Sequence, residues 1–394
     1  MKKILLTSLI FTSLVWFWSC QSAGTSASEE TDTTAVAFIA NPSGFEIHRG
    51  VNISHWLSQT RPWSKRDVFF TQADMKLIKS LGYDHIRLPI DEVEVFDETG
   101  GLLDSSIQSI HNAIKWAFDE DLRVILDLHI LRSHHFNARN NEGKITLWED
   151  TVAQATFIRL WDTLSAHMNQ YPNKMLAYEF MNEPVAPEHE MWNKLINKAV
   201  SSIRAKEPNR VLMMGSNRWQ KPHTFPFLEV PKGDKNIILT VHTYAPYFLT
   251  HHKAYWSAAA RYTGPISYPG ITITKEDYEK YISPTDSPLV SRIAEEKGLE
   301  FFDRNKLQEI LQPAVDKAKE LGLQLYCSEF GCLPSVEREM RLRYYRDITQ
   351  VFRQNKVTWS NWDYKGDFGI VGWDREKLVT LEADTVITNI LTKR

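Results

Sequence analysis

The sequence predicts a (β/α)8 barrel, an α/β fold in which eight parallel strands alternate with helices. Short β-branched or apolar runs alternate with longer amphipathic runs from about residue 45 onward, which is typical of a parallel sheet covered by helices. Eight strand-like runs are present, the number that closes such a barrel. The 394 residues exceed the roughly 250 of a typical barrel, and insertions account for the difference.

Each predicted strand has the length expected of a barrel strand. The eight strands span residues 48–53, 84–89, 123–129, 175–182, 210–216, 236–244, 324–330 and 357–362.

Amphipathic segments between these strands predict the covering helices. In residues 72–81, Met75, Ile78 and Leu81 recur at helical spacing, and Gly82 follows as a C-terminal stop. The other predicted helices span residues 105–118, 152–167, 191–206, 304–321 and 336–353.

The connection after the sixth strand is much longer than a barrel loop needs. It runs over residues 245–303, with turns at Gly264-Pro265 and Pro269-Gly270. Long loops in compact domains usually have a function. We therefore expect a single domain with an enlarged loop after the sixth strand and no second domain with a core of its own.

The N-terminus predicts export. Lys2 and Lys3 precede an apolar run over residues 4–18, which is shorter than the ~20 residues that span a bilayer. Cys20 then resembles the lipid-carrying cysteine of a bacterial lipoprotein signal. We expect a signal peptide at 1–20, a flexible Ser/Thr-rich tether at 21–40 and the barrel at 41–394.

This N-terminus leaves three outcomes open: a cell-envelope lipoprotein in the outer membrane or periplasm, a secreted protein, or an uncleaved anchor. Contact with a membrane is expected only through a lipid on Cys20.

Composition narrows the class of protein and its partners. With 43% hydrophobic and 24% charged residues, the chain has the balance of a soluble globular protein. A formal charge of -3 and no basic stripe argue against nucleic acid as a partner. Cys327 and Cys332 lie close in one apolar stretch, so we expect two buried thiols rather than a disulfide. We expect a monomer.

Polar residues end most of the predicted strands. In a (β/α)8 barrel the C-terminal ends of the strands form the active site, so these residues should converge although they are distant in sequence. They are Arg87, Asp127, His129, Asn182, Glu183, His242, Tyr244, Glu329, Asn361 and Trp362.

Two of these residues, Glu183 and Glu329, suggest a reaction. Hydrolysis of a glycosidic bond needs a carboxylic acid and a carboxylate that flank the same bond, one to protonate the leaving oxygen and one to stabilise or trap the positive sugar. Arg87 and Tyr244 are expected beside Glu329, where they would keep it ionised and oriented. We therefore assign Glu329 as the nucleophile and Glu183 as the general acid/base.

The remaining polar strand ends are expected to bind the substrate. Asn182 would reach a sugar hydroxyl beside the reacting carbon. His129 and His242 would hold the substrate or tune the two carboxylates. No cofactor is expected, because two carboxylates and protein dipoles supply this chemistry.

Other acidic residues and histidines are interpreted more simply. Glu179 and Glu190 are expected to be solvated surface charges. A metal site is not expected, because the chain contains no His-Glu-x-x-His run and adjacent histidines rarely share a metal. His134, His135 and His251 are expected to line the cleft or face solvent.

The same residues, in this order on successive strands, resemble glycoside hydrolase family 5, the cellulase and mannanase family. The resemblance covers most of residues 45–390. The motifs that carry it are Arg87-Leu88-Pro89, His129, Asn182-Glu183-Pro184, His242 with Tyr244, Glu329-Phe330-Gly331 and Trp362.

The resemblance implies a retaining mechanism with Glu183 as acid/base and Glu329 as nucleophile. It also implies that Trp362 forms the floor of the subsite that holds the scissile sugar. The implied substrate is a β-linked glucan or a mannan-type polysaccharide or oligosaccharide. The segment 245–303 departs from the commonest cellulases, which leaves sugar, linkage and endo or exo action open.

Two other functions fit the same sequence. A surface glycan-binding lipoprotein would keep the barrel and the aromatic cleft without catalysis. An exo-acting β-glycosidase or transglycosylase would use the same carboxylates and differ only in cleft shape and access of water.

Overall fold

The computed structural model describes residues 41–136 and 143–393. The predicted signal peptide at 1–20, which includes Cys20, and the predicted tether at 21–40 lie outside the described residues. Within the described ranges, no helix combines the length and the apolar character needed to cross a bilayer.

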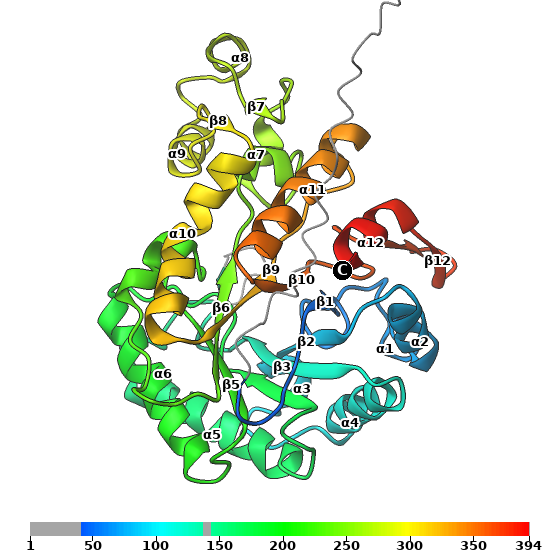
Figure 1. Cartoon of the computed structure of the whole chain (residues 1–394), viewed down its shortest axis with the longest axis vertical. Coiled ribbons are helices and arrows are strands. Elements are labelled where there is room, and N and C mark those ends of the chain that lie inside the picture. The colour runs from blue at the N-terminus through cyan, green and yellow to red at the C-terminus, as the bar shows by residue number, and fades with distance from the viewer. Residues whose placement is uncertain (1–40, 137–142, 394) are drawn as a thin grey trace, which may run out of the picture. The chain divides into compact units, whose positions relative to one another are not determined.

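Eight parallel strands close into a barrel in the order β1-β2-β3-β4-β5-β6-β9-β10 (Figure 1). All eight strands predicted from the sequence are present, so the predicted fold class is confirmed. Their bounds are β1 Arg49–Asn52, β2 His85–Asp91, β3 Arg123–Ile130, β4 Leu176–Glu179, β5 Val211–Gly215, β6 Ile237–His242, β9 Gln324–Glu329 and β10 Thr358–Asn361.

All six predicted helices are also present, and their ends follow from local sequence. Thr71 and Asp74 form a capping box at the start of α2, and α10 ends at Gly322, whose φ of 60° is the left-handed conformation that glycine adopts without strain. The six helices are α2 Gln72–Ser80, α4 Asp104–Asp119, α5 Thr151–Met168, α6 His189–Arg204, α10 Arg304–Leu321 and α11 Arg338–Gln354.

Shorter elements complete the connections. A 3₁₀ helix, η1 Pro222–Phe227, lies between β5 and β6 where other connections carry an α-helix. The others are α1 Arg66–Phe69, α3 Glu92–Val95 and the C-terminal α12 Thr385–Thr392.

The inside of the barrel is apolar toward the N-terminal ends of the strands. A buried cluster there consists of Phe45, Ile47, Ile125, Ala177, Val211, Met213, Ile238 and Tyr326. Phe45 and Ile47 precede β1, and Ser43 donates its amide to Asn236 just before β6 (3.1 Å), which places this segment at the N-terminal end of the barrel. The N-terminal segment therefore contributes side chains that fill the barrel floor.

Charged side chains occupy the next inward layer. Asp127 follows Ile125 by two residues on β3, and Glu179 follows Ala177 by two on β4, so each shares the inward face of its strand. Both carboxylates are fully buried. A buried charge is costly unless it is paired, and this layer therefore requires a cation.

The segment after β6 is a folded insertion, residues 245–303, within the same compact unit as the barrel. It contains α7 Tyr247–Thr250, η2 Ala258–Arg261, β7 Gly270–Ile271, α8 Lys275–Tyr281, α9 Ser287–Glu295 and β8 Phe301–Phe302. Its own buried cluster consists of Phe248, Ala259, Tyr262, Ile273, Ile282, Leu289 and Ile293. These apolar residues are scattered among turns, so neither helical nor strand periodicity revealed them.

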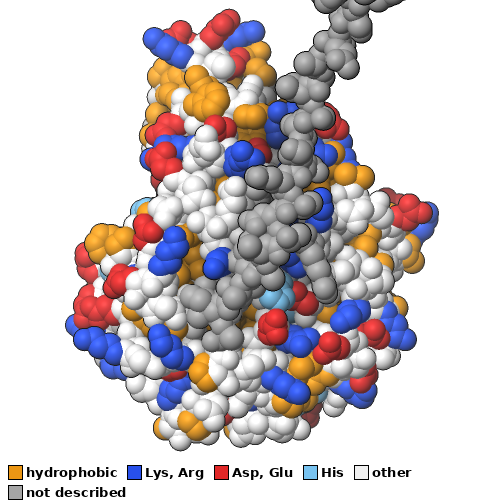
Figure 2. Space-filling view, viewed as in Figure 1, with side chains coloured by type: hydrophobic (Ala, Val, Ile, Leu, Met, Phe, Trp, Pro, Cys, Tyr) orange, Lys and Arg blue, Asp and Glu red, His pale blue; other side chains and the backbone are white. Residues whose placement is uncertain are grey.

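The insertion also exposes apolar side chains. Figure 2 shows hydrophobic side chains gathered over this part of the molecule, and Ile271, Leu299 and Phe301 are among the exposed large hydrophobic residues. Ile271 and Phe301 face each other across the short antiparallel pair β7 and β8.

A buried ion pair fixes the chain after β10. Lys365 Nζ lies 2.5 Å from Asp74 Oδ1 in α2, and both side chains are almost completely buried. Lys365 also donates to the carbonyl of Phe69 at 2.9 Å. The chain then forms a hairpin of β11 Val371–Asp374 and β12 Val379–Ala383, which the sequence patterns did not predict.

Cys327 and Cys332 are both buried free thiols. The prediction that they form no disulfide is therefore confirmed for this pair.

Candidate active site

The predicted site residues lie together at the C-terminal ends of the barrel strands. Arg87 is in β2, His129 in β3, His242 ends β6 and Glu329 ends β9. Asn182 and Glu183 follow β4, Tyr244 follows β6 and Trp362 follows β10.

The two glutamates face each other across His242. Nδ1 of His242 lies 2.9 Å from Oε1 of Glu183 and 3.7 Å from Oε2 of Glu329. One oxygen of each carboxylate and a ring nitrogen of His242 all lie within 4.8 Å of one another. The separation matches the close spacing of carboxyl groups, about 5–5.5 Å, that retaining glycosidases use.

Arg87 is the buried cation of the charged layer. Its guanidinium is fully buried and pairs with Glu329 (2.9 Å), Glu179 (2.7 Å) and Asp127 (3.0 Å). It also donates to Oδ1 of Asn182 at 2.8 Å. The rigid fork of arginine suits several planar acceptors at once.

The interpretation of Glu179 as a surface charge was wrong. Its side chain has no exposed area and accepts two hydrogen bonds from Arg87, at 2.7 and 3.2 Å. Because strand residues alternate in direction, its position two residues after the inward Ala177 carried the signal. By contrast, Glu190 is about half exposed and pairs with Lys194, four residues on, as a surface charge would.

Glu329 is held through both oxygens. Oε1 accepts from Arg87, and Oε2 accepts from the Tyr244 hydroxyl at 2.9 Å. Two donors fix the orientation of this carboxylate and favour its ionised form.

The two glutamates hold a proton with different strength. Burial, and then the nearby charge of Glu329, raise the pKa of Glu183 well above its usual range. Burial also raises the pKa of Glu329, but the charge of Arg87 and the Tyr244 hydrogen bond act against that rise. Two like charges this close cannot both ionise easily, and Glu183, which has the more strongly raised pKa, is the one of the pair that favours the protonated form.

Glu183 sits on an unusual backbone conformation. Its φ is 46°, in the left-handed region that is uncommon for a residue other than glycine. Such strained positions often occur at functional sites, where the surrounding structure holds them.

The side-chain amide of Asn182 makes a hydrogen bond through its oxygen but not through its nitrogen. Oδ1 accepts from Arg87, whereas Nδ2 is buried and has no hydrogen-bond partner within the described residues. Because Arg87 fixes the amide, the free N–H donor has a defined direction.

His129 is a neutral ring with a defined partner. Burial lowers its pKa to about 3, and its Nδ1 lies 2.6 Å from Asp127 Oδ2. Burial raises the pKa of Asp127 to about 7. The His129 ring stacks on Trp362, with centroids 5.5 Å apart and an interplanar angle of 9°. Trp362 is thereby held with one face against His129.

Of the two alternatives expected for three histidines, lining the cleft or facing solvent, exposure to solvent is excluded, because all three are buried. They are His134, His135 and His251, each less than 8% exposed. His251 packs against Tyr244 with ring centroids 4.9 Å apart. His134 contacts the ring of Trp148 and the amide of Val185, which lie on other segments of the chain.

Sequence reasoning also missed Asn52, a residue of β1. Its Oδ1 accepts from Arg87 at 3.0 Å, and its Nδ2 donates to the carbonyl of Ser328 at 2.9 Å. It thus links Arg87 to the residue before Glu329. A polar residue at the C-terminal end of β1, directly after Val51, was the available signal.

The side chains of Glu183, His242 and Glu329 each offer a possible metal-ligand atom, and these atoms are close enough to bind one cation. In the described part of the chain, no other group of three such side chains is this close. The chemistry of a carboxylate pair does not require such an ion, and the absence of a catalytic metal stays a prediction.

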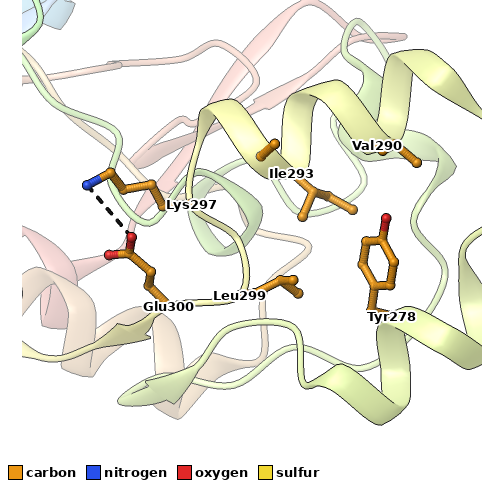
Figure 3. Close-up of a pocket in the computed structure, with 7 residues that line it drawn as sticks. Tyr278, Val290, Ile293, Lys297, Leu299 and Glu300 are labelled. Atoms are coloured by element: carbon orange, nitrogen blue, oxygen red, sulfur yellow. Dashed lines mark ion pairs between the residues drawn. The ribbon is translucent and has the colours of Figure 1, made fainter.

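A separate cavity of about 280 Å³ lies in the insertion (Figure 3). It is lined by Tyr278, Val290, Ile293, Ala294, Lys297, Leu299 and Glu300, with Lys297 and Glu300 3.7 Å apart. This set contains none of the predicted site residues.

Comparisons with known proteins point to one family. The family model "Cellulase (glycosyl hydrolase family 5)" matches residues 36–367. Endoglucanase C of Acetivibrio thermocellus is 31% identical over 353 residues, which cover 88% of this chain and 98% of the relative. Cellodextrinase A of Ruminococcus flavefaciens is 25% identical over 79% of this chain and 84% of the relative.

Solved structures share the fold. Thermotoga maritima Cel5A, solved in complex with mannotriose, is similar with a TM-score of 0.69 and 21% identity, over 89% of this chain and 98% of that chain. A second structure described as a glycoside hydrolase has a TM-score of 0.71 and 18% identity, over 88% and 99% of the two chains.

The raised pKa of Glu183 predicts a pH-dependent effect of Glu183→Gln on stability. A carboxyl whose pKa is raised by folding stabilises the native state fully below its unfolded pKa and loses that contribution as pH rises. The Glu183→Gln variant has no carboxyl at this position, so its stability does not fall in this way as pH rises. We expect it to match the wild type at low pH, and its stability advantage over the wild type to grow as the pH rises through neutrality.

Urea unfolding at pH 4, 6 and 8 measures this difference. The exposed Glu190→Gln is the matched control for the loss of a carboxylate at the surface. A Glu183→Gln variant whose advantage does not grow with pH would contradict the raised pKa.

Proposed function

The chain belongs to the cellulase family, glycosyl hydrolase family 5, and is an endoglucanase-type O-glycosyl hydrolase, and from this premise we propose that it cleaves internal bonds of a β-linked glucan or mannan-type polysaccharide with retention of configuration. One observation carries the proposal: Glu183 and Glu329 place carboxylate oxygens within 4.8 Å of each other. That gap leaves no room for the intervening water that an inverting enzyme needs.

In the first step, Glu329 attacks the anomeric carbon and forms an ester bond to the sugar. The bond from that carbon to the leaving oxygen breaks, and Glu183 transfers its proton to that oxygen. The assignment follows from the environments: Glu329 is paired with Arg87 at 2.9 Å and hydrogen-bonded to Tyr244, and Glu183 retains the proton because burial raises its pKa.

In the second step, a water molecule attacks the anomeric carbon and the bond to Glu329 breaks. Glu183, now ionised, takes the proton of that water. The two displacements on one carbon restore the original configuration, and both glutamates return to their starting states.

The surrounding residues bind and orient the sugar. We assign the free Nδ2 donor of Asn182 to the hydroxyl beside the reacting carbon. Trp362 offers a flat ring for the apolar face of the sugar. His129 and His242 stay neutral because burial lowers the pKa of both rings, so they act as hydrogen-bonding groups rather than charges.

The proposed substrate class draws on the relatives. Endoglucanase C is named for internal cleavage of glucan, and the Cel5A structures contain mannotriose or cellobiose. Glucans and mannans both present a chain of equatorial β-linkages, and an aromatic ring at the floor of the site accommodates such a chain.

The proposal predicts that the purified protein releases reducing ends from a panel of soluble β-glucans, mannans and xylans. Early products should be of mixed length, because internal cleavage shortens the polymer before small sugars accumulate. Product sizing by chromatography measures this. Exclusive release of mono- or disaccharide from the start would instead indicate exo action, and retention of the polymer without any release would indicate a glycan-binding protein.

Substitution of the two glutamates should separate their roles. Glu329→Ala should abolish turnover of every substrate, because no covalent intermediate forms. Glu183→Ala should lower kcat/KM on polysaccharide roughly 10²–10⁴-fold but spare the first step on aryl glycosides whose leaving group needs no proton.

Steady-state kinetics on both substrate types give the comparison, with Glu190→Ala as a surface control that should retain full activity. Full activity of Glu329→Ala on polysaccharide would end the proposal.

We also propose that the chain is exported and that Cys20 carries lipid, on the basis of Lys2, Lys3 and the apolar run that precedes Cys20. Mass spectrometry of the mature N-terminus from a bacterial host should find a diacylated Cys20. Cys20→Ser should remove the lipid and release the protein from the membrane fraction. A mature wild-type chain that begins after Cys20 would refute lipidation and leave secretion.

A further inference from the structure

The insertion contacts the active site through a column of aromatic rings. Arg292 of α9 lies over the ring of Tyr247 of α7, 5.3 Å from its centroid. Tyr247 stacks on His251, with centroids 4.2 Å apart and an interplanar angle of 12°. The edge-to-face contact of His251 with Tyr244 continues the column at 4.9 Å. Tyr244 is the residue that donates to Glu329.

The strand alone does not hold the Tyr244 ring. β6 ends at His242, so Tyr244 lies two residues beyond the ladder. Around its ring lie Phe368, with centroids 5.8 Å away, and His251. The direction of the Tyr244 hydroxyl thus depends on rings that lie outside the barrel strands.

Hydrogen bonds fix His251 itself. Its Nδ1 lies 3.0 Å from Thr250 Oγ1, and the same hydroxyl donates to the carbonyl of Tyr244 at 2.6 Å. Thr250 therefore ties the side chain of His251 to the backbone of the tyrosine it packs against. Burial lowers the pKa of His251 to about 3, so at neutral pH this residue acts through its shape and hydrogen bond rather than through charge.

We propose that His251 is a positioning residue: it holds the Tyr244 hydroxyl on Glu329, and the insertion holds His251 through Tyr247 and Arg292. This inference rests on the proposed role of Glu329 as the nucleophile. Residues 245–303 would then affect the reaction by orienting Tyr244, and His251 would not need to contact the substrate.

The consequence is a shift in the ionisation of Glu329. The Tyr244 hydrogen bond favours the ionised carboxylate, and loss of His251 lets the ring move and weakens that bond. The other titratable and charged groups around Glu329 stay in place when His251 is replaced: they are Arg87, Asp127, His129, Glu183, His242, Cys327 and Asp363. A change in the acidic limb of the pH profile then reports on the Tyr244 bond.

The test is the pH dependence of kcat/KM on the panel polysaccharide that the wild type cleaves fastest. We expect His251→Ala to move the acidic limb to higher pH, toward the position seen with Tyr244→Phe. A shift of one unit lowers kcat/KM about tenfold on the acid side of the limb. His251→Phe keeps a ring in the same place and should restore most of the wild-type limb.

Ile273→Ala is the matched control for a merely structural effect. Ile273 is buried in the apolar cluster of the insertion and does not belong to the ring column. This variant should lower the thermal unfolding temperature and leave the acidic limb unchanged.

An acidic limb in His251→Ala that coincides with the wild type would overturn the inference, as would an equal shift in Ile273→Ala. If His251→Ala does not fold, Tyr247→Ala is judged by the same criterion, since it removes the ring stacked on His251. Failure of the proposed function is a different result, because the wild type itself would then release no sugar.

Discussion

The pairing of Arg87 with three carboxylates is the interaction on which the site depends. Asp127, Glu179 and Glu329 converge on one buried guanidinium, and each would be costly to bury without it. Arg87 also orients Asn182. A single cation therefore sets the charge of one reacting group and the direction of a substrate donor.

Much of the barrel and of the site was predictable from the sequence because both follow from strand ends. A parallel barrel gathers the C-terminal ends of its strands at one face, so residues such as Arg87 and Glu329 converge whatever their separation along the chain. The error at Glu179 had a different origin. Because Glu179 is charged, we expected it to face solvent. Side chains alternate in direction along a strand, and the predicted bounds of the strand did not show which set of alternate residues faces the inside of the barrel.

The insertion could not be predicted in the same way. Its short elements have no sustained periodicity, and its apolar residues pack only after distant turns come together. The contact between His251 and Tyr244 is likewise tertiary, although the two residues are only seven positions apart. A sequence pattern indicates which face a residue occupies on an element, but it does not indicate which ring from another turn will pack there.

The side chains of Phe45 and Ile47 at the barrel floor limit how a substrate can enter and how products can leave. The apolar cluster that they complete with the lower strands leaves the interior as packed core, and above it the Arg87 layer is also filled. A long polymer cannot thread through such a barrel. Fresh chain must arrive, and both cut pieces must depart, across the one open face where the two glutamates lie.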